Sequence, residues 1–290
     1  MKRFRVKNRE ALTGMLYAAV PLAGFAVFFA APFVISVVRT FYSGAGSLRF
    51  VGLAHYISVF QSEAFRLALG NTLRFIGLGV PLILALSFTL SVALRSVPRG
   101  KNVFHSLFIM PLVVPVASVI LVFSIVFERS GILNHALASL GLLSVDFMNG
   151  DKAFIVLMIL YIWKNCGYNI ILFLAGLSQI PSEYYDAAKT DGASAWRTTV
   201  LVTLPLLAPT IFFTTVVSVI NCFKSFREAF ALFGAYPHQS IYMLQHFMNN
   251  NFYSLNYARL SVASLLTFTI IITLVAVLYG FREKAGDHPL

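Results

Sequence analysis

The stretch NVFHSLFIMPLVVPVASVILVFSIVF, residues 102–127, contains no Asp, Glu, Lys or Arg. A helix needs about 20 such residues, at a rise of about 1.5 Å each, to cross the hydrocarbon core of a bilayer. Similar stretches recur along the chain, and one of them, 153–181, is interrupted only by Lys164. We therefore predict an all-α polytopic membrane protein with six transmembrane helices, at about residues 11–38, 75–94, 102–127, 153–181, 204–223 and 260–281.

The composition excludes several other classes of protein. The 290 residues are 58% apolar and only 11% charged, with a mean hydropathy of +0.80, whereas about a quarter of the residues in a soluble domain are charged. Disorder requires low hydrophobicity, and the strands of membrane β-barrels are alternating segments of about ten residues. The first apolar stretch is longer than the core of a signal peptide, which spans about 7 to 15 residues, so we predict a retained span.

The basic residues predict the orientation. If the N-terminus is inside, the inner segments are 1–10, 95–101, 182–197 and 282–290, and the outer ones are 39–74, 128–152 and 224–259. Lys and Arg are roughly three times denser in the inner segments, and such flanks stay in the cytoplasm. We therefore predict cytoplasmic tails at 1–10 and 282–290 around a membrane domain at 11–281. The basic flanks explain the net charge of +11 without a nucleic-acid partner.

The chemistry of an enzyme is missing from the sequence. There is no GxxxxGK[ST] phosphate loop, and the six histidines show neither HExxH spacing nor a cluster with cysteine. All eleven Asp and Glu lie outside the six spans, although ion-coupled carriers often place acidic groups inside them. We predict a transport subunit with no catalytic residues, no metal site and no cofactor of its own. An ATPase-independent channel or secondary carrier is the rival hypothesis.

The loop between the fourth and fifth spans has an unusual composition. It reads IPSEYYDAAKTDGASAWRTTVLVTLPLLAP, residues 180–209. Residues 183–189 are compatible with a short helix whose N-terminal acidic residues favour its dipole, and 193–199 are compatible with a second one. Gly192 supplies the positive φ that a tight turn between them needs. Ala187 and Ala188 leave one helix face almost bare, so another protein's surface can approach closely.

This loop resembles the EAA loop of bacterial binding-protein-dependent ABC importers, written E-A-A-x-x-D-G-A and followed by an aromatic residue and Leu-Pro. Here the pattern is DAAKTDGA at 186–193, then Trp196 and Leu204-Pro205, with Asp186 in place of the usual Glu. The resemblance implies a type I importer permease fold in which the loop 182–203 docks on an ATPase. The coupling residues it implies are Glu183, Asp186, Ala187, Ala188, Asp191, Gly192, Ala193 and Trp196.

The first part of the chain, with FVGLAHY at 50–56 and NTL at 71–73, is similar to the larger-partner permeases of the carbohydrate uptake subfamily. The resemblance implies a bacterial inner-membrane protein that forms a heterodimer with a second permease. It also implies two cytoplasmic ATP-binding subunits, which hold ATP and Mg, and an extracytoplasmic solute-binding protein. A carbohydrate is the expected substrate, and a non-sugar or anionic solute such as glycerol phosphate is the alternative, because the loop alone does not select a substrate.

Polar side chains inside the fourth and fifth spans predict the substrate pathway, because polar groups in hydrocarbon are costly. Their spacing places each set on one side of its helix, and the resemblance to maltose-type permeases places substrate contacts in the same two stretches. Hydrogen bonding between helices is the alternative explanation. The candidates are Lys164, Asn165, Tyr168, Asn169, Ser218, Asn221 and Ser225.

Lys164 lies about 16 Å from the edge of its span by helical rise. At that depth its ammonium needs either an acidic partner or an anionic substrate. Glu128, Glu228 and an acidic residue of a partner subunit are the candidate partners.

Overall fold

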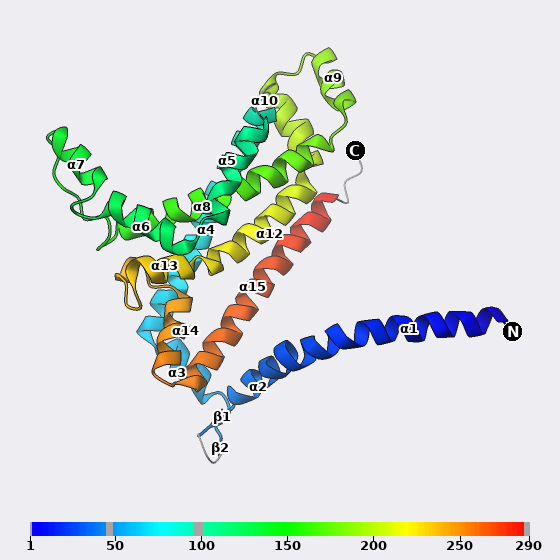
Figure 1. Ribbon diagram of the computed structural model, residues 1–290, viewed down its shortest axis with the longest axis vertical. Coiled ribbons are helices and arrows are strands. Elements are labelled where there is room, and N and C mark those ends of the chain that lie inside the picture. The colour runs from blue at the N-terminus through cyan, green and yellow to red at the C-terminus, as the bar shows by residue number, and fades with distance from the viewer. Residues whose placement is uncertain (1, 45–48, 96–100, 287–290) are drawn as a thin grey trace. The chain divides into compact units, whose positions relative to one another are not determined.

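A computed structural model describes residues 2–44, 49–95 and 101–286, which are almost entirely helical (Figure 1). Six helical segments in this part of the chain are long and apolar enough to cross a membrane, in agreement with the predicted number. They are Thr13–Arg39, Glu63–Arg95, Val116–Ser139, Ala153–Ser178, Ala208–Phe233 and Tyr257–Gly280.

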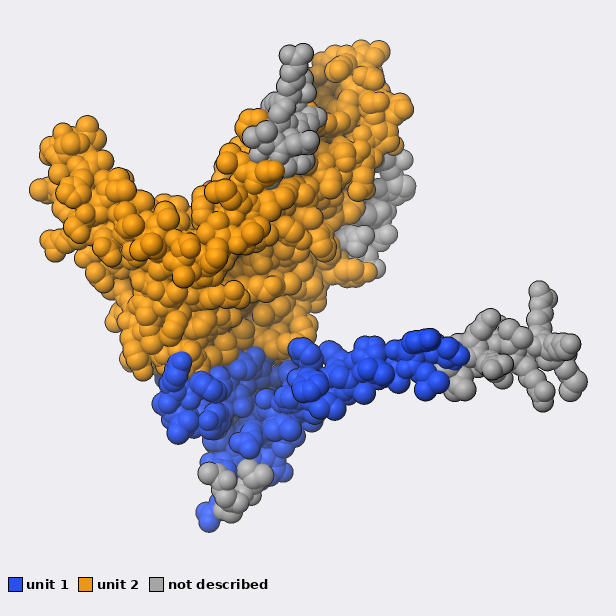
Figure 2. Space-filling model, in the orientation of Figure 1, with its two compact units in different colours: residues 1–62, 251–266 blue, residues 63–250, 267–290 orange. Residues whose placement is uncertain are grey.

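The chain divides into two compact units, shown in Figure 2. Unit 1 comprises residues 1–62 and 251–266. It contains α1 (Lys2–Phe25), a π-helical turn (Ala26–Ala30), α2 (Ala31–Arg39), the antiparallel strands β1 (Tyr42–Ser43) and β2 (Arg49–Phe50), α3 (Ala54–Gln61) and the first part of α15 (Tyr257–Gly286). Tyr56 Oη donates a hydrogen bond to Thr40 Oγ1 at 2.9 Å, and Arg259 Nη2 donates one to Ser58 Oγ at 2.9 Å. These two bonds hold the short elements of unit 1 together.

Unit 2 comprises residues 63–250 and 267–290 and contains the main helical core. Its helices are α4 (Glu63–Arg95), α5 (Lys101–Val113), α6 (Val116–Phe127), α7 (Ile132–Ser139), α8 (Ala153–Ser178), α9 (Ser182–Thr190), α10 (Ala195–Thr198), α11 (Leu204–Leu206), α12 (Ala208–Lys224), α13 (Phe226–Phe233) and most of α14 (Leu244–Tyr253). A π-helical turn (Thr199–Thr203) and a 3₁₀ turn (Gln239–Ile241) complete it. The rest of α15 also belongs to this unit.

Helix α8 lies at the centre of unit 2 and packs against α4, α5 and α12. Its apolar sequence is buried on several sides, and Leu157 and Ile170 are completely buried. Gly167 faces the backbone of α5, and a Cβ there would lie 1.7 Å from the Phe108 carbonyl oxygen. Membrane helices approach this closely where a small residue replaces a side chain.

Two of the predicted spans are divided between helices in the structure. The stretch 102–127 is not one straight helix, because α5 ends at Val113 and α6 begins at Val116. Pro115, at the N-cap of α6, has no backbone N–H to continue the ladder of α5. The stretch 204–223 is likewise divided between α11 and α12, and Ser225 separates α12 from α13.

Several helices also extend beyond the charge-free stretches. Helix α4 begins at Glu63 rather than near 75, α1 begins at Lys2 within the predicted tail, and α15 ends at Gly286. Charge-free stretches measure only the part of a helix that hydrocarbon surrounds, and a helix tolerates charged side chains at its ends. Residues 287–290 of the predicted C-terminal tail lie outside the described residues.

Candidate functional site

The elbow, residues 182–203, has the helix-turn-helix form that its sequence predicts. Helix α9 ends in a Schellman motif, in which Ala193 N–H donates to Ala188 O at 2.9 Å and Gly192 N–H donates to Lys189 O at 3.0 Å. Gly192 has a φ of +72°, a conformation that strains any residue with a Cβ. Ser194 Oγ then caps α10 by accepting from Arg197 N–H. The elbow therefore has a defined shape that its own backbone maintains.

Most of the predicted coupling residues lie on the surface of the elbow. Trp196 is 75% exposed, although a side chain of this kind is usually at least partly buried. Ala188 is buried and Ala193 is half-buried. The exposed members of the predicted set are Glu183, Asp186, Ala187, Asp191, Gly192 and Trp196. An exposed surface with acidic groups, a bare alanine and a large aromatic ring is suited to contact another protein.

Tyr185 links the two ends of the elbow to each other and to α4. The Arg95 guanidinium at the end of α4 lies 4.5 Å from the centre of the Tyr185 ring, and Thr203 Oγ1 donates to Tyr185 Oη at 3.4 Å. These three residues were not among the sequence candidates. No spacing rule connects them, because they lie on three separate elements.

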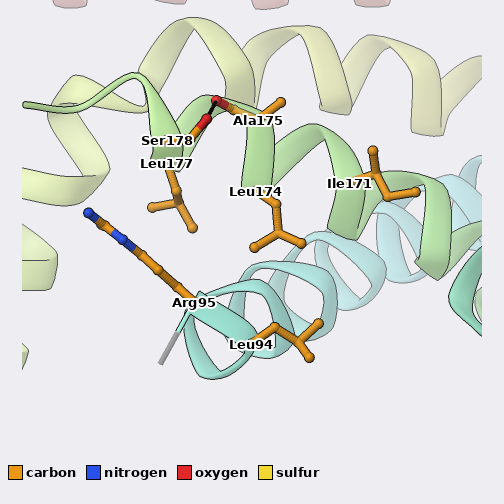
Figure 3. A pocket seen from close by; sticks show the side chains of 7 residues that line it. All are labelled: Leu94, Arg95, Ile171, Leu174, Ala175, Leu177 and Ser178. Carbon is orange, nitrogen blue, oxygen red and sulfur yellow. Dashed lines mark hydrogen bonds between the residues drawn. The ribbon is translucent and has the colours of Figure 1, made fainter. Parts of the chain in front are cut away.

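A mostly apolar cavity of about 440 Å³ lies beside this anchor, between the ends of α4 and α8. Figure 3 shows the side chains from the two helix ends facing one another across it, with Arg95 at its rim. Its other lining residues are Leu94, Ile171, Leu174, Ala175, Leu177 and Ser178.

A second cavity, which we name the mid-span cavity, brings together four of the seven predicted pathway residues. Its volume is about 260 Å³ and it lies where α5, α8, α12 and α13 meet. Its lining residues are Leu112, Lys164, Asn165, Asn221, Lys224, Ser225, Arg227 and Glu228. The sequence had assigned Lys224 and Arg227 to the outer segment 224–259.

The mid-span cavity lies near the middle of α8, at the ends of α5 and α12. Lys164 is about 16 Å from one end of α8 and about 21 Å from the other, by helical rise. Leu112 is about 16 Å from the start of α5, and Asn221 about 20 Å from the start of α12. Helices α5 and α12 both end beside the cavity. Broken helices at mid-depth leave backbone and polar groups free to line a solvated site.

Lys164 forms an ion pair with Glu228, one of the three partners that the sequence left open. The two side chains are only 16% and 8% exposed. Removing either charge leaves the other buried without its partner, which is strongly destabilising. The pair also ties α13 to the centre of α8.

Asn165, Tyr168, Asn169 and Ser218 differ in their surroundings. Asn169 Nδ2 donates to Ser218 Oγ at 2.9 Å, and both side chains are buried, so this pair joins α8 to α12 as an interhelical hydrogen bond. Asn165 Nδ2 donates to Tyr161 O at 2.8 Å within α8. Tyr168 is half-buried and does not line the mid-span cavity.

Comparison with known proteins gives the family. The model of the family described as "Binding-protein-dependent transport system inner membrane component" matches residues 85–284. The chain is 30% identical over 233 residues to the lactose transport system permease protein LacF of Rhizobium radiobacter, covering 79% of this chain and 78% of the relative. It is 31% identical over 241 residues to the sn-glycerol-3-phosphate transport system permease protein UgpA of Agrobacterium fabrum, covering 82% of each.

A solved structure shares the fold. This is the crystal structure of a bacterial ABC transporter involved in the import of the acidic polysaccharide alginate. It is 20% identical in sequence, with a TM-score of 0.84 over 97% of this chain and 99% of that chain.

The six apolar helices are those of a multi-pass membrane protein. The chain belongs to the family of binding-protein-dependent transport system inner membrane components. The predicted family and fold class are therefore confirmed. The protein is a transport subunit of the inner membrane that operates with a solute-binding protein.

Proposed function

We propose that this chain is one of two permease subunits of an ATP-driven importer for a carbohydrate. The elbow supports this proposal most directly, because an ordered and exposed helix-turn-helix at the end of a buried helix is a docking element. The relatives support the substrate class: LacF is named as a lactose permease, and AraP of Bacillus subtilis, 30% identical over 222 residues, as an arabinooligosaccharide permease. UgpA keeps glycerol phosphate as the second candidate substrate.

The connections of the elbow supply a mechanism. Helix α8 ends four residues before α9, and α10, a π-helical turn, α11 and α12 follow one another from the elbow to the mid-span cavity. The lining residues Lys164 and Asn165 are carried by α8, whereas Asn221 and Lys224 are carried by α12. A rigid-body displacement of the elbow therefore acts on both walls of the cavity. This is the form that alternating access takes in our proposal.

The subunit composition follows from the same mechanism. Two cytoplasmic ATP-binding subunits hold ATP and Mg and move the elbow, while a second, related permease completes the pathway. Both termini and the elbow lie in the cytoplasm, and the solute-binding protein docks on the opposite side. A channel or secondary carrier that operates without an ATPase is the rival hypothesis that the following experiments test.

Crosslinking tests the docking role. A photo-crosslinking residue at Ala187, which is exposed on α9, should capture an ATP-binding subunit in the assembled transporter. The matched control is Ala136, which is likewise an exposed alanine, on α7, and should not capture it. Equal capture at the two positions, or solute flux by this chain alone in liposomes, would refute the proposal.

Strain at the elbow tests the coupling. Gly192→Val forces a branched residue into a φ of +72°, so we expect the complex to assemble but ATP hydrolysis to lose its link to uptake. The control is Gly141→Val, which introduces the same strain at a φ of +71° in the turn after α7. Uptake per ATP that falls equally in both variants would contradict a specific role for the elbow.

A further inference from the structure

The mid-span cavity carries more positive than negative charge. Three cationic residues line it, Lys164, Lys224 and Arg227, against one carboxylate, Glu228. Glu228 is in contact with Lys164. Lys224 and Arg227 are exposed, and among the described residues no carboxylate lies within ion-pair distance of either. Two full positive charges therefore remain beside a neutralised pair.

The position of these charges limits what they face. They line the same cavity as Lys164, which lies near the middle of α8. A charged side chain at that depth is costly when lipid surrounds it, and such residues face water, a partner charge or a substrate. Lys224 and Arg227 therefore belong to the solvated pathway and not to the lipid-facing surface.

Neutral hydrogen-bonding groups line the same cavity. Asn165, Asn221 and Ser225 supply amide and hydroxyl groups of the kind that bind sugar hydroxyls. Lys and Arg add charge-assisted donors, and Arg suits the planar geometry of a carboxylate or the oxygens of a phosphate. A solute that has both hydroxyl groups and a negative charge uses the whole lining.

We infer that the pathway selects anionic carbohydrates, with Lys224 and Arg227 as the groups that recognise the carboxylate or phosphate. This inference rests on the proposed function, since it names the substrate class of the same pathway. The competing explanation is that acidic residues of the second permease neutralise both cations. In that case the assembled pathway has no positive potential.

Thiol labelling measures the electrostatic potential of the mid-span cavity. It requires neither a known substrate nor transport coupled to ATP hydrolysis. The variant Asn221→Cys places a thiol one helical turn from Lys224. It is studied in the assembled transporter in lipid nanodiscs. The wild-type protein gives the background labelling, because Cys166 and Cys222 are buried. Labelling rates are measured with sulfonatoethyl and trimethylammonioethyl methanethiosulfonate, each divided by its rate with a free thiol. We expect a normalised preference of about tenfold for the anionic reagent, because two unit charges act at close range even with screening.

Charge removal gives the matched comparison. Adding Lys224→Gln and Arg227→Gln should reduce the preference to about one, whereas Lys152→Gln, an exposed cation at the outer end of α8, should leave it unchanged. A normalised preference of one or less in the variant that retains both cations would overturn the inference. A preference that survives the double substitution would also overturn it.

Uptake identifies the anionic group. Proteoliposomes with the complete transporter and its binding protein are given digalacturonate, glucose 6-phosphate or neutral lactose. The inference is supported if uptake of either charged probe falls at least about tenfold in Lys224→Gln/Arg227→Gln and is retained in Lys224→Arg. The probe that responds shows whether the pathway recognises a carboxylate or a phosphate. Uptake of lactose alone overturns the inference but leaves the proposed function intact. If the binding protein does not stimulate ATP hydrolysis by the transporter, the proposed function is contradicted. The inference about the charge of the cavity is then decided by the labelling rates alone.

Discussion

The close contact between α8 and α5 gives the sharpest stability prediction. In Gly167→Ala the new Cβ would lie 1.7 Å from the Phe108 carbonyl oxygen and 2.4 Å from its carbon. A carbon and an oxygen rarely approach closer than about 3.3 Å, so the helices must separate by about 1.6 Å. The obstacle is backbone, which cannot rotate away. Because α5 also carries Leu112, the separation should distort the mid-span cavity.

The expected magnitude follows from two opposing effects. Overpacking costs about 1–3 kcal/mol and more when backbone must move, while alanine gains about 1 kcal/mol over glycine in a helix. We expect a net loss of about 2 kcal/mol, which corresponds to a Tm lower by about 4–8 °C. The assay is thermal unfolding of the purified complex in detergent, followed by the fluorescence of a thiol-reactive dye.

Two other glycines provide a graded control. At Gly176 the added Cβ meets Thr210 Oγ1 at 2.4 Å and Leu207 Cδ1 at 2.8 Å, and side chains can shift more easily than backbone, so the loss should be smaller. At Gly77, on α4, nothing lies within 4 Å, and alanine should be neutral or stabilising. If Gly167→Ala unfolds at the same temperature as Gly77→Ala, the reasoning from helix contact is wrong.

Three further predictions concern buried polar groups. Lys164→Met or Glu228→Gln alone should each cost about 3–5 kcal/mol, and the double variant should recover most of the Tm; a double variant less stable than both single ones would contradict the ion pair. Burial lowers the pKa of His246 to about 4 from 6.5. Above pH 6.5 the imidazole is neutral in both the folded and the unfolded chain, so the free energy of unfolding keeps its full value. It falls by about 3 kcal/mol as the pH drops to 4, because the unfolded chain binds the proton more tightly. Thermal unfolding against pH checks this, and His246→Phe should lack that component of the slope. Asn134 exchanges two hydrogen bonds with the backbone of Val145, so Asn134→Leu should increase proteolysis of the segment after α7 and leave the helical core protected.

The chain itself predicts the elements that depend on local chemistry. Apolar stretches long enough to span a bilayer predict the number of spans, because the solvent around each helix selects its side chains. The elbow is equally local: the acidic residues, the paired alanines and Gly192 lie within ten positions, and the turn that they predict is the turn observed. The family followed from the same short motif.

Only the tertiary structure decides which distant groups meet. Three acidic partners were open to Lys164, and the packing of α13 against α6 and α12 places Glu228, 64 positions away, in contact with it. The packing of α12 on α8 joins Asn169 to Ser218, two predicted pathway residues, in a hydrogen bond between helices, and it brings Lys224, assigned to a loop, into the cavity. Hydropathy and spacing describe one helix at a time. They contain no information on the rotation and depth of one helix relative to another, and those two quantities determine whether a polar side chain meets a protein partner or water.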